Sequence, residues 1–433
     1  MDLHYEKNLN IPVIAEIDVL VVGGGPGGLG ASVMAARQGV SVVLAERYGC
    51  PGGMASFGEI TPFMMNHLHG ITLDKPVYVD WCRRMWEYQT AAQREEVFNE
   101  EVTINTKIAK DVAMLAAEDL MLEAGVKIFY HHTLVDVIRD GNRIVAAVFS
   151  TKSGLCAIKA KQFVDATGDG DLAALAGCDF EFGNEDGFCQ PMTLCFKLGG
   201  VDRSRMPEGK EINRLYDEAK AAGRIVCPRE NVLWFLTVDD DVIHFNTTRI
   251  IKKSGVNGQD LSEAEIEGRR QLRDYLKFLR DSVPGFENAY IYSIAHHIGI
   301  RETRRVLGEH YQTADDFMTR KKYDDAVVKV RYSIDIHNPS GTGTVMHFMD
   351  ADDWYEISFR TLIVKGMANL LMGCRAISID HALHSSARVM PPVCSIGQAA
   401  GMGAAMAVKG NCTLQELNSV EVREALRAQG AEL

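Results

Sequence analysis

The chain has 433 residues, of which 46% are hydrophobic and 24% charged, a composition typical of a folded globular protein with two or three lobes. Its net charge of −12 argues against a nucleic-acid-binding protein, although local basic residues can still bind an anionic substrate. We find no membrane span and no signal peptide, and the ten cysteines form no CxxC pair, so we expect a cytoplasmic protein without structural zinc or iron–sulfur clusters.

The N-terminal part has the pattern strand, glycine turn, helix, strand. Residues 17–22 are a short apolar run typical of a buried parallel strand. Gly23, Gly25 and Gly28 then satisfy GxGxxG, and a helix predicted over 29–38 would direct its N-terminus at a diphosphate. A second strand over 40–45 ends at Glu46, which is placed to bind ribose hydroxyls and disfavours a 2′-phosphate. The unit predicts binding of an ADP moiety.

The middle of the chain continues with helices and then strands. Residues 77–123 are predicted to be mostly helical, with an amphipathic helix over 108–123 that ends at Gly125. A strand over 126–130 precedes a hairpin of 133–138 with 144–150, which 156–160 extends into a meander. A further buried strand starts at Phe163 and enters the glycine turn at Thr167-Gly168, followed by a helix over 172–176.

The C-terminal part returns to the pattern of a nucleotide-binding fold. Residues 369–373 are predicted to form a strand, and a helix of small residues is predicted to begin at Ile396 and run to Val408. The predicted class is therefore α/β, with a Rossmann-type nucleotide domain built from discontinuous segments at 1–61, 106–178 and 365–433. A helical insertion is expected at 62–105, and an inserted mixed α+β substrate domain at 179–364.

Several motifs in a fixed order carry a family resemblance. They are the glycine turn at 23–28, Glu46-Arg47 followed by Gly52-Gly53-Met54, the turn at 166–169, and the segments at 373 and 397–401. Over nearly the whole chain this order resembles FAD-dependent oxidoreductases of the glutathione-reductase-like fold, particularly those related to fumarate reductase flavoproteins and thiazole synthases. The resemblance implies FAD as cofactor.

The resemblance also implies roles for single residues. The first glycine turn and Glu46 would hold the ADP half, Val135 would touch adenine, and the helix start at 396–399 would direct its amides at the pyrimidine ring of the flavin. Because a second GxGxxG unit is absent from the sequence, we expect the substrate or an unknown donor to reduce the flavin. The implied cofactor-binding residues are Gly23, Gly25, Pro26, Gly27, Gly28, Glu46, Arg47, Gly52, Gly53, Met54, Val135, Thr167, Gly168, Ile396, Gly397, Gln398 and Ala399.

The densest polar cluster lies at residues 296–305. Arg301 is a candidate to bind a substrate carboxylate, and His297 is a candidate for proton transfer. Arg304 and Arg305 are expected to be solvated or salt-bridged surface groups, and His296 is a candidate core histidine.

A second polar set precedes the C-terminal helix. His381, His384 and Arg388 would share one helical face, and we select His384 and Arg388 as candidate catalytic residues. No carboxylate or cysteine completes a metal signature beside the two histidines, so no metal is predicted. His337 stands beside Asn-Pro and several glycines, which favours a turn over a ligand contact.

Three further residues near the expected cofactor are considered. Gln190 opens the first strand expected in the inserted domain and is a candidate to face the flavin. Cys50 and Cys394 are each a candidate for a covalent flavin link, but a buried thiol is the favoured interpretation for both.

Together these patterns predict an FAD-dependent dehydrogenase or reductase. It would transfer a hydride between flavin N5 and a carbon of a small polar substrate, either carboxylated or hydroxylated. The alternative is a non-redox lyase, isomerase or synthase that uses FAD structurally. Homo-oligomer formation and the electron donor or acceptor stay open.

Overall fold

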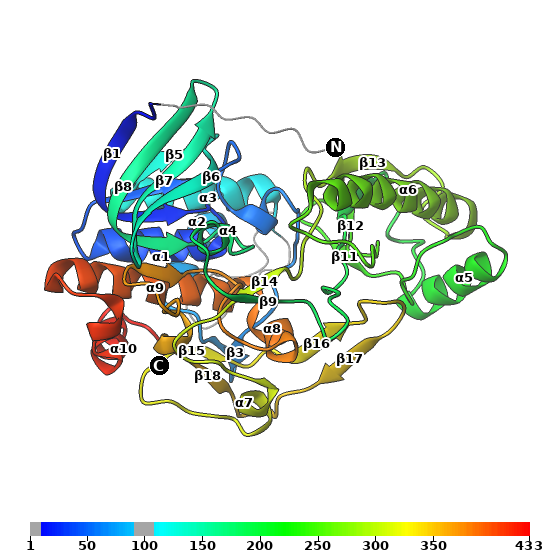
Figure 1. Cartoon of the computed structure of the whole chain (residues 1–433). Coiled ribbons are helices and arrows are strands. Elements are labelled where there is room, and N and C mark those ends of the chain that lie inside the picture. Colours follow the sequence, from blue (N-terminus) through cyan, green and yellow to red (C-terminus); the bar gives the residue numbers. More distant parts are fainter. Residues whose placement is uncertain (1–9, 91–107) are drawn as a thin grey trace.

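A seven-stranded sheet forms the centre of the larger part of the molecule. The computed structural model describes residues 10–90 and 108–433, and the sheet lies at the left of Figure 1. β1, β2, β5, β8 and β19 pair in parallel, which confirms the predicted α/β class with a parallel, Rossmann-type sheet. The strand order is β5 (Lys127–Phe129), β2 (Val42–Ala45), β1 (Val13–Val22), β8 (Gly154–Asp165), β7 (Arg143–Thr151) and β6 (Thr133–Asp140), and β19 (Leu370–Met372) also pairs with β8.

One long strand, β8, belongs to both the parallel and the antiparallel parts of this sheet. Its first half pairs antiparallel with β7, and Phe163 to Asp165 pair in parallel with β19, while β1 runs in parallel along its other edge. The prediction of two separate strands, at 156–160 and from Phe163, was therefore wrong. Lys161 is exposed and interrupts the apolar pattern at that point, but the backbone pairing continues through it.

Two helices of small residues, α1 (Pro26–Arg37) and α9 (Met390–Gly410), cross at very short distance on this sheet. A Cβ added at Gly397 would lie 1.8 Å from the carbonyl oxygen of Gly27, and one at Gly401 would lie 2.2 Å from that of Ala31. The two backbones therefore touch directly, and the crossing depends on the absence of these side chains. The start of α1 is held against the C-terminal helix in this way.

A second lobe, at the right of Figure 1, has its own antiparallel sheet and core. Phe196, Phe245 and Tyr275 are among the residues buried in that core. The strand order is β11 (Trp234–Leu236), β12 (Ile243–Phe245), β10 (Phe196–Gly199) and β13 (Tyr290–Ile294), and the helices are α5 (Gly209–Ala221) and α6 (Gly258–Ser282).

The remaining elements lie outside this second core, and several of them contribute to the core of the larger part, for example through Phe317, Val328 and Tyr355. They are η1 (Gly53–Ala55), β3 (His67–Leu68), β4 (Ile71–Thr72), α2 (Val77–Tyr88), α3 (Lys110–Glu123), α4 (Asp171–Leu175), β9 (Phe180–Phe182), β14 (Arg304–Val306), α7 (Ala314–Met318), β15 (Ala326–Val330), β16 (Ile334–His337), β17 (Thr344–His347), β18 (Tyr355–Ser358), η2 (Phe359–Thr361), α8 (His381–Ala387), η3 (Leu414–Glu416) and α10 (Ser419–Ala428).

Most predicted elements are present with shifted ends. The helix expected over 108–123 is α3, and the expected hairpin is β6 with β7. The first helix begins at Pro26 rather than at residue 29, because proline suits the first helical position, where an N–H has no helical partner. Part of the predicted helical insertion, 91–105, lies outside the described residues.

The described part of the chain contains no helix long and apolar enough to cross a membrane. All ten cysteines are free. Among residues 10–90 and 108–433, no three histidine, cysteine or acidic side chains are grouped as a metal site.

Candidate functional site

The glycine turn after β1 packs tightly against the chain on one side. Gly23 has φ +103°, a backbone conformation that residues with a side chain rarely adopt. A Cβ there would also lie 2.4 Å from the carbonyl oxygen of Ala166, so both conformation and space exclude a side chain. A Cβ at Gly28 would lie 1.9 Å from the carbonyl oxygen of Gly23. At Gly25 the nearest atom would be 3.9 Å away, so this backbone is open to a ligand. The turn leads into α1 with its free amides.

Glu46 holds the end of β2 against this turn. Its two carboxylate oxygens accept hydrogen bonds from the backbone amides of Gly24, at 2.6 Å, and Tyr48, at 2.8 Å. Burial raises the pKa of Glu46, and each carboxylate oxygen keeps a further lone pair for a hydroxyl donor.

Two further loops close around the turn. The amide of Gly52 donates to the carbonyl of Gly24 at 2.8 Å, and Gly53, with φ +53°, lies so close that its added Cβ would be 2.8 Å from the Cα of Gly25. On the other side, the hydroxyl and amide of Thr167 donate to the buried carboxylate of Asp165 at 2.7 and 3.0 Å. The predicted segments at 52–54 and 167–168 therefore meet at the first glycine turn.

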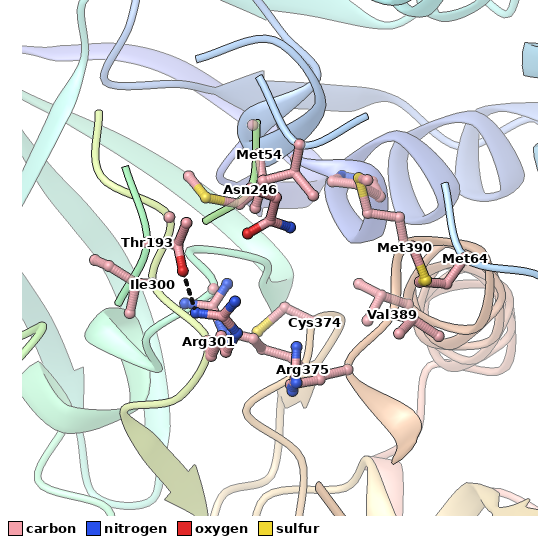
Figure 2. Close-up of a pocket in the computed structure, with 18 of the residues that line it drawn as sticks. Met54, Met64, Thr193, Asn246, Ile300, Arg301, Cys374, Arg375, Val389 and Met390 are labelled. Atoms are coloured by element: carbon pink, nitrogen blue, oxygen red, sulfur yellow. Dashed lines mark hydrogen bonds between the residues drawn. The ribbon is translucent and has the colours of Figure 1, made fainter. Parts of the chain in front are cut away.

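These segments form one end of a cavity of about 550 Å³ that extends to the second lobe. Figure 2 shows Met64, Val389 and Met390 grouped on one side of it, with Arg301 and Thr193 on the other. Lining residues at the glycine end include Gly23, Gly25, Pro26, Gly27, Glu46, Arg47, Gly53, Met54, Thr167 and Gly168.

The far end of the cavity carries three arginines. Arg301 Nη1 donates to the carbonyl of Pro191 and to Thr193 Oγ1, both at 2.6 Å, and Arg229 Nε donates to Asn231 at 3.1 Å. Among the described residues, no carboxylate forms a salt bridge with Arg229, Arg301 or Arg388. Burial, followed by the charges of Arg388 and Arg229, lowers the pKa of Arg301 to about 9. An anion bound here would relieve this mutual repulsion.

A small polar group lies beside the arginines on and before β16. Tyr332 Oη donates to Asp335 Oδ2 at 3.3 Å, and His337 Nε2 lies 3.6 Å from the same oxygen. All three residues line the cavity. The turn predicted around His337 is present at 338–343, but His337 itself ends β16 and faces the cavity, so its interpretation as a turn residue was wrong.

The candidate catalytic residues are separated by the fold. Arg301, Arg388 and His297 all line the cavity, but the two arginines lie at its far end, whereas the ring of His297 lies beside that of Tyr48, with centroids 5.9 Å apart. His384 is fully buried, and neither ring nitrogen has a hydrogen-bond partner in the described chain. Burial lowers its pKa, and it lies outside the set of residues that line the cavity. The shared face predicted for His384 and Arg388 therefore does not bring His384 into the site.

The neighbouring candidates also differ from expectation. Arg304 pairs with Asp171 at 2.8 Å, and Arg305 pairs with Glu302; both arginines are salt-bridged, as predicted, but Arg305 is buried rather than at the surface. His296 is exposed rather than in the core. Gln190 is buried, and neither its side-chain Nε2 nor its Oε1 has a hydrogen-bond partner in the described residues.

The predicted helix start at 396–399 was wrong. The helix α9 begins at Met390, so Ile396, Gly397, Gln398 and Ala399 lie in its second and third turns, and all four are buried. Gln398 instead bonds Val77 and Lys75 at the start of α2. Prolines at 391 and 392 open the helix, which proline favours because it fits the first turn.

Val135, Cys50 and Cys394 complete the predicted set. Val135 lies on β6 and is 40% exposed, and the cavity lining does not include it. Cys394 is fully buried, and Cys50 is half-buried with its Sγ 4.0 Å from Ser56 Oγ.

The sequence interpretation missed Arg229, Tyr332 and Asp335. Each comes from a segment without a recognisable motif, and only the fold brings them to Arg301 and Arg388. A signal was available at Asp335, which stands two residues before His337 in an alternating strand pattern that places both side chains on one face.

Comparison with known proteins agrees with this nucleotide-binding geometry. The family model described as FAD dependent oxidoreductase matches residues 18–426. The chain belongs to this family. Its cofactor is FAD. The open backbone at Gly25 and the buried carboxylate of Glu46 fit the ADP half of FAD.

Two relatives are similar over part of the chain. Thiamine thiazole synthase of Desulfosudis oleivorans is 32% identical over 183 residues, which are 39% of this chain and 61% of that protein. Digeranylgeranylglycerophospholipid reductase of Picrophilus torridus is 28% identical over 160 residues, 35% of this chain and 39% of that protein. The chain thus aligns with less than two thirds of the length of either relative.

Comparison with solved structures gives matches at low identity and with TM-scores below 0.5. A geranylgeranyl bacteriochlorophyll reductase-like protein from Thermoplasma acidophilum is 14% identical, with a TM-score of 0.47, and the match covers 96% of this chain and 84% of that one. The flavin-dependent brominase Bmp2 is also 14% identical, with a TM-score of 0.44 and coverage of 96% and 83%.

Proposed function

We propose that this FAD-dependent oxidoreductase has a glutathione-reductase-like nucleotide lobe and binds a small carboxylated substrate at the arginine end of the cavity. The glycine end would hold the ADP half of FAD. The residues proposed to contact FAD are Gly23, Gly25, Pro26, Gly27, Gly28, Glu46, Arg47, Gly52, Gly53, Met54, Thr167 and Gly168; a contact between Val135 and adenine stays a prediction.

The observation that carries the proposal is the group of three arginines without carboxylate partners. Arg229 is 5% exposed, so its charge is largely removed from water. Burying charge without a counter-charge is unfavourable, and a planar carboxylate matches the donor fork of a guanidinium. Carboxylate binding by Arg301 and Arg388, with Arg229 beside them, supplies the missing negative charge.

The proposed reaction is hydride transfer to or from a carbon of the bound substrate. Bound FAD supplies the hydride acceptor or donor at flavin N5. The arginines would hold the substrate in one orientation, and the apolar side chains of Met64, Val389 and Met390 would keep water from the reacting carbon.

The test is Arg388→Gln in the FAD-loaded enzyme. The side chain of Arg388 has no hydrogen bond or salt bridge to the described residues, and its backbone bond to His384 is kept in the variant, so the substitution leaves the fold intact. We expect kcat/KM for carboxylate substrates, found by profiling anaerobic flavin bleaching, to fall about 10- to 100-fold, with FAD content unchanged.

Arg320→Gln is the control, because Arg320 pairs with Asp350 near the surface. Normal kinetics in both Arg388→Gln and Arg301→Lys would refute the carboxylate site. A flavin that stays oxidised while substrate is consumed would refute hydride transfer and leave a non-redox lyase, isomerase or synthase reaction.

A further inference from the structure

Four carboxylates line the cavity, and Asp335 differs from the other three. Glu46 accepts two backbone amides, Asp169 pairs with Arg375 at 2.8 Å, and Glu230 pairs with Arg249 at 3.0 Å. Asp335 lies among the arginines at the far end, but its side-chain partners in the described residues are a tyrosine hydroxyl and a histidine ring. Its carboxylate is thus held beside the substrate space without being paired to an arginine.

His337 cannot serve as the proton acceptor beside it. Its Nδ1 lies 3.3 Å from Nη2 of Arg249, and a guanidinium can only donate, so Nδ1 is the accepting nitrogen. The proton of the neutral ring is then on Nε2, which faces Asp335. Burial, and then the charges of Arg301 and Arg388, hold the pKa of His337 far below its ordinary range. The ring stays neutral and acts as a donor.

Two other titratable side chains of the cavity do not replace Asp335 as the proton acceptor at the arginine end. Burial raises the pKa of Tyr332 to about 12, so its hydroxyl stays protonated and donates to Asp335. His297 Nδ1 donates to the carbonyl of Ile298 at 2.6 Å, which leaves Nε2 free to accept a proton, but its ring lies beside Tyr48 and its charged neighbours are Arg47, Glu265 and Asp169, not the three arginines of the far end. Asp335 remains as the acceptor at the arginine end.

We propose that Asp335 is the general base of the reaction and that the substrate is a hydroxy acid. The inference rests on the proposed function. The substrate carboxylate binds Arg301 and Arg388, and its hydroxyl donates to Asp335. In the oxidation, the carbinol C–H bond breaks and its hydride, with two electrons, is taken up by oxidised FAD. The hydroxyl proton goes to the carboxylate of Asp335, the C=O bond forms, and Asp335 later releases the proton to solvent.

The charge balance favours a hydroxyl over an ammonium at this position. Two carboxylates, Asp335 and Glu230, stand against the four arginines Arg229, Arg249, Arg301 and Arg388, and Glu230 pairs with Arg249 at 3.0 Å. The substrate carboxylate reduces this excess of positive charge without reversing it. An ammonium group on the substrate would therefore be repelled by the arginines, whereas a neutral hydroxyl donor would not.

Binding is measured first, on holoenzyme whose flavin has been chemically reduced under anaerobic conditions, so that no hydride can leave the ligand. The probes are two pairs of a hydroxy acid and its deoxy partner, lactate with propionate and malate with succinate. The dissociation constant of each is measured by calorimetry. We expect each hydroxy acid to bind about ten-fold more tightly than its deoxy partner, because a hydrogen bond to a charged group is lost in the latter. In Asp335→Asn this preference should shrink, because a neutral amide oxygen accepts a hydroxyl proton more weakly than a carboxylate does, while propionate and succinate should bind at least as tightly as before.

Flavin bleaching is measured second, with the oxidised holoenzyme and the hydroxy acid that reduces it fastest. Asp335→Asn should slow bleaching by at least about 100-fold at unchanged FAD content. The control is Asp353→Asn, a partly exposed surface carboxylate that pairs with Lys322. An Asp335→Asn enzyme that bleaches at the normal rate, or a wild type that binds alanine as tightly as lactate, would overturn the inference.

The binding measurements distinguish failure of the proposed carboxylate site from failure of the proposed role of Asp335. If Arg388→Gln binds propionate and succinate normally, the carboxylate site itself is wrong. If Arg388→Gln loses these anions but wild type does not distinguish hydroxy acids from their deoxy partners, the carboxylate site stands and only the role of Asp335 is refuted.

Discussion

Glu46 is the residue on which the glycine end depends most. Its carboxylate joins the turn after β1 to the end of β2 through two backbone amides, at Gly24 and Tyr48. Hydrogen bonds from amides to a carboxylate are stronger than those between neutral groups. A single buried side chain thus fixes the turn and presents lone pairs to the cofactor at the same time.

Glu46→Gln should therefore weaken FAD binding. The amide keeps one accepting oxygen, but its NH₂ group would face a backbone donor, so the turn loses one of its two anchors. We expect the dissociation constant for FAD to rise at least about ten-fold, measured by fluorescence titration of the apoprotein. Glu424→Gln on α10, whose carboxylate is exposed, is the matched control. Equal affinity in the two variants would contradict this role.

At the same scale, the sequence predicted the glycine end better than the substrate end. Gly23, Gly28 and Glu46 follow one another in a short segment whose spacing is set by one turn and one helix. Arg229 and Asp335 come from distant segments that meet only through the fold, so no local spacing reveals them. His384 was misjudged because helical periodicity gives the face of a residue but not what covers that face.

Among the elements, α9 shows how a motif can be assigned to the wrong part of a helix. The glycines at 397 and 401 suggested a helix start that approaches a ligand, but they permit contact with α1. Of the amides in the first turn, two are absent because residues 391 and 392 are proline, and Val393 donates to the carbonyl of Val389. The helix thus has few free donors at its N-terminus, and Arg388 beside it carries the positive charge.

Gly397→Ala tests the contact between α1 and α9. The added Cβ would meet the carbonyl oxygen of Gly27 at 1.8 Å, a backbone atom that cannot move without shifting α1 and the glycine turn. We expect a loss of more than about 2 kcal/mol of stability together with loss of bound FAD, seen in thermal unfolding and in flavin absorbance. Gly258→Ala, at the first position of α6 with nothing within 4 Å, should be neutral. A normal melting temperature for Gly397→Ala would contradict the close crossing.

At the scale of the whole molecule, Glu59 joins the two lobes. It is fully buried, and its carboxylate bonds Lys110 Nζ on α3 at 2.7 Å and Ser293 Oγ on β13 at 2.8 Å, with Lys197 Nζ on β10 at 3.4 Å. Burial alone would raise its pKa, but Lys110 and Lys197 lower the pKa of Glu59 below its usual value. The charge of Glu59 is therefore stabilised by both lobes at once.

Glu59→Gln should destabilise the assembly of the lobes, because it leaves two lysines without their shared counter-charge. We expect a loss of about 3 kcal/mol at pH 7, measured as a lower melting temperature. Because the pKa of Glu59 is lower in the folded state, its charge stabilises the folded protein at every pH above the ordinary value of 4.5. The difference in melting temperature between Glu59→Gln and wild type should therefore persist down to that pH and narrow only as the pH falls further. A difference that vanished between pH 7 and pH 5 would contradict this account.

The lobe boundaries predicted from the sequence stay a prediction, although the described residues form two large, separate hydrophobic cores. The core of the second lobe uses residues between Phe196 and Ala289, whereas Val306 to Val364 contribute to the core that contains α1 and α9. The class of the sheet was predictable because apolar runs and glycine turns are local. The position of the boundary depends on which core a segment joins, and residues 306–364 have no local pattern that distinguishes the two.

The pairing of β19 with β8, and of α9 with α1, also has a consequence for the order of folding during synthesis. The N-terminal glycine unit lacks these neighbours until the ribosome has passed residue 410, whereas the sheet of the second lobe comes from one continuous stretch, 196–294. Contacts between distant parts of a chain form late, and continuous domains fold as units while translation proceeds. We therefore expect the second lobe to be folded before FAD can be captured, so the nascent chain acquires its flavin only after α9 has been synthesised.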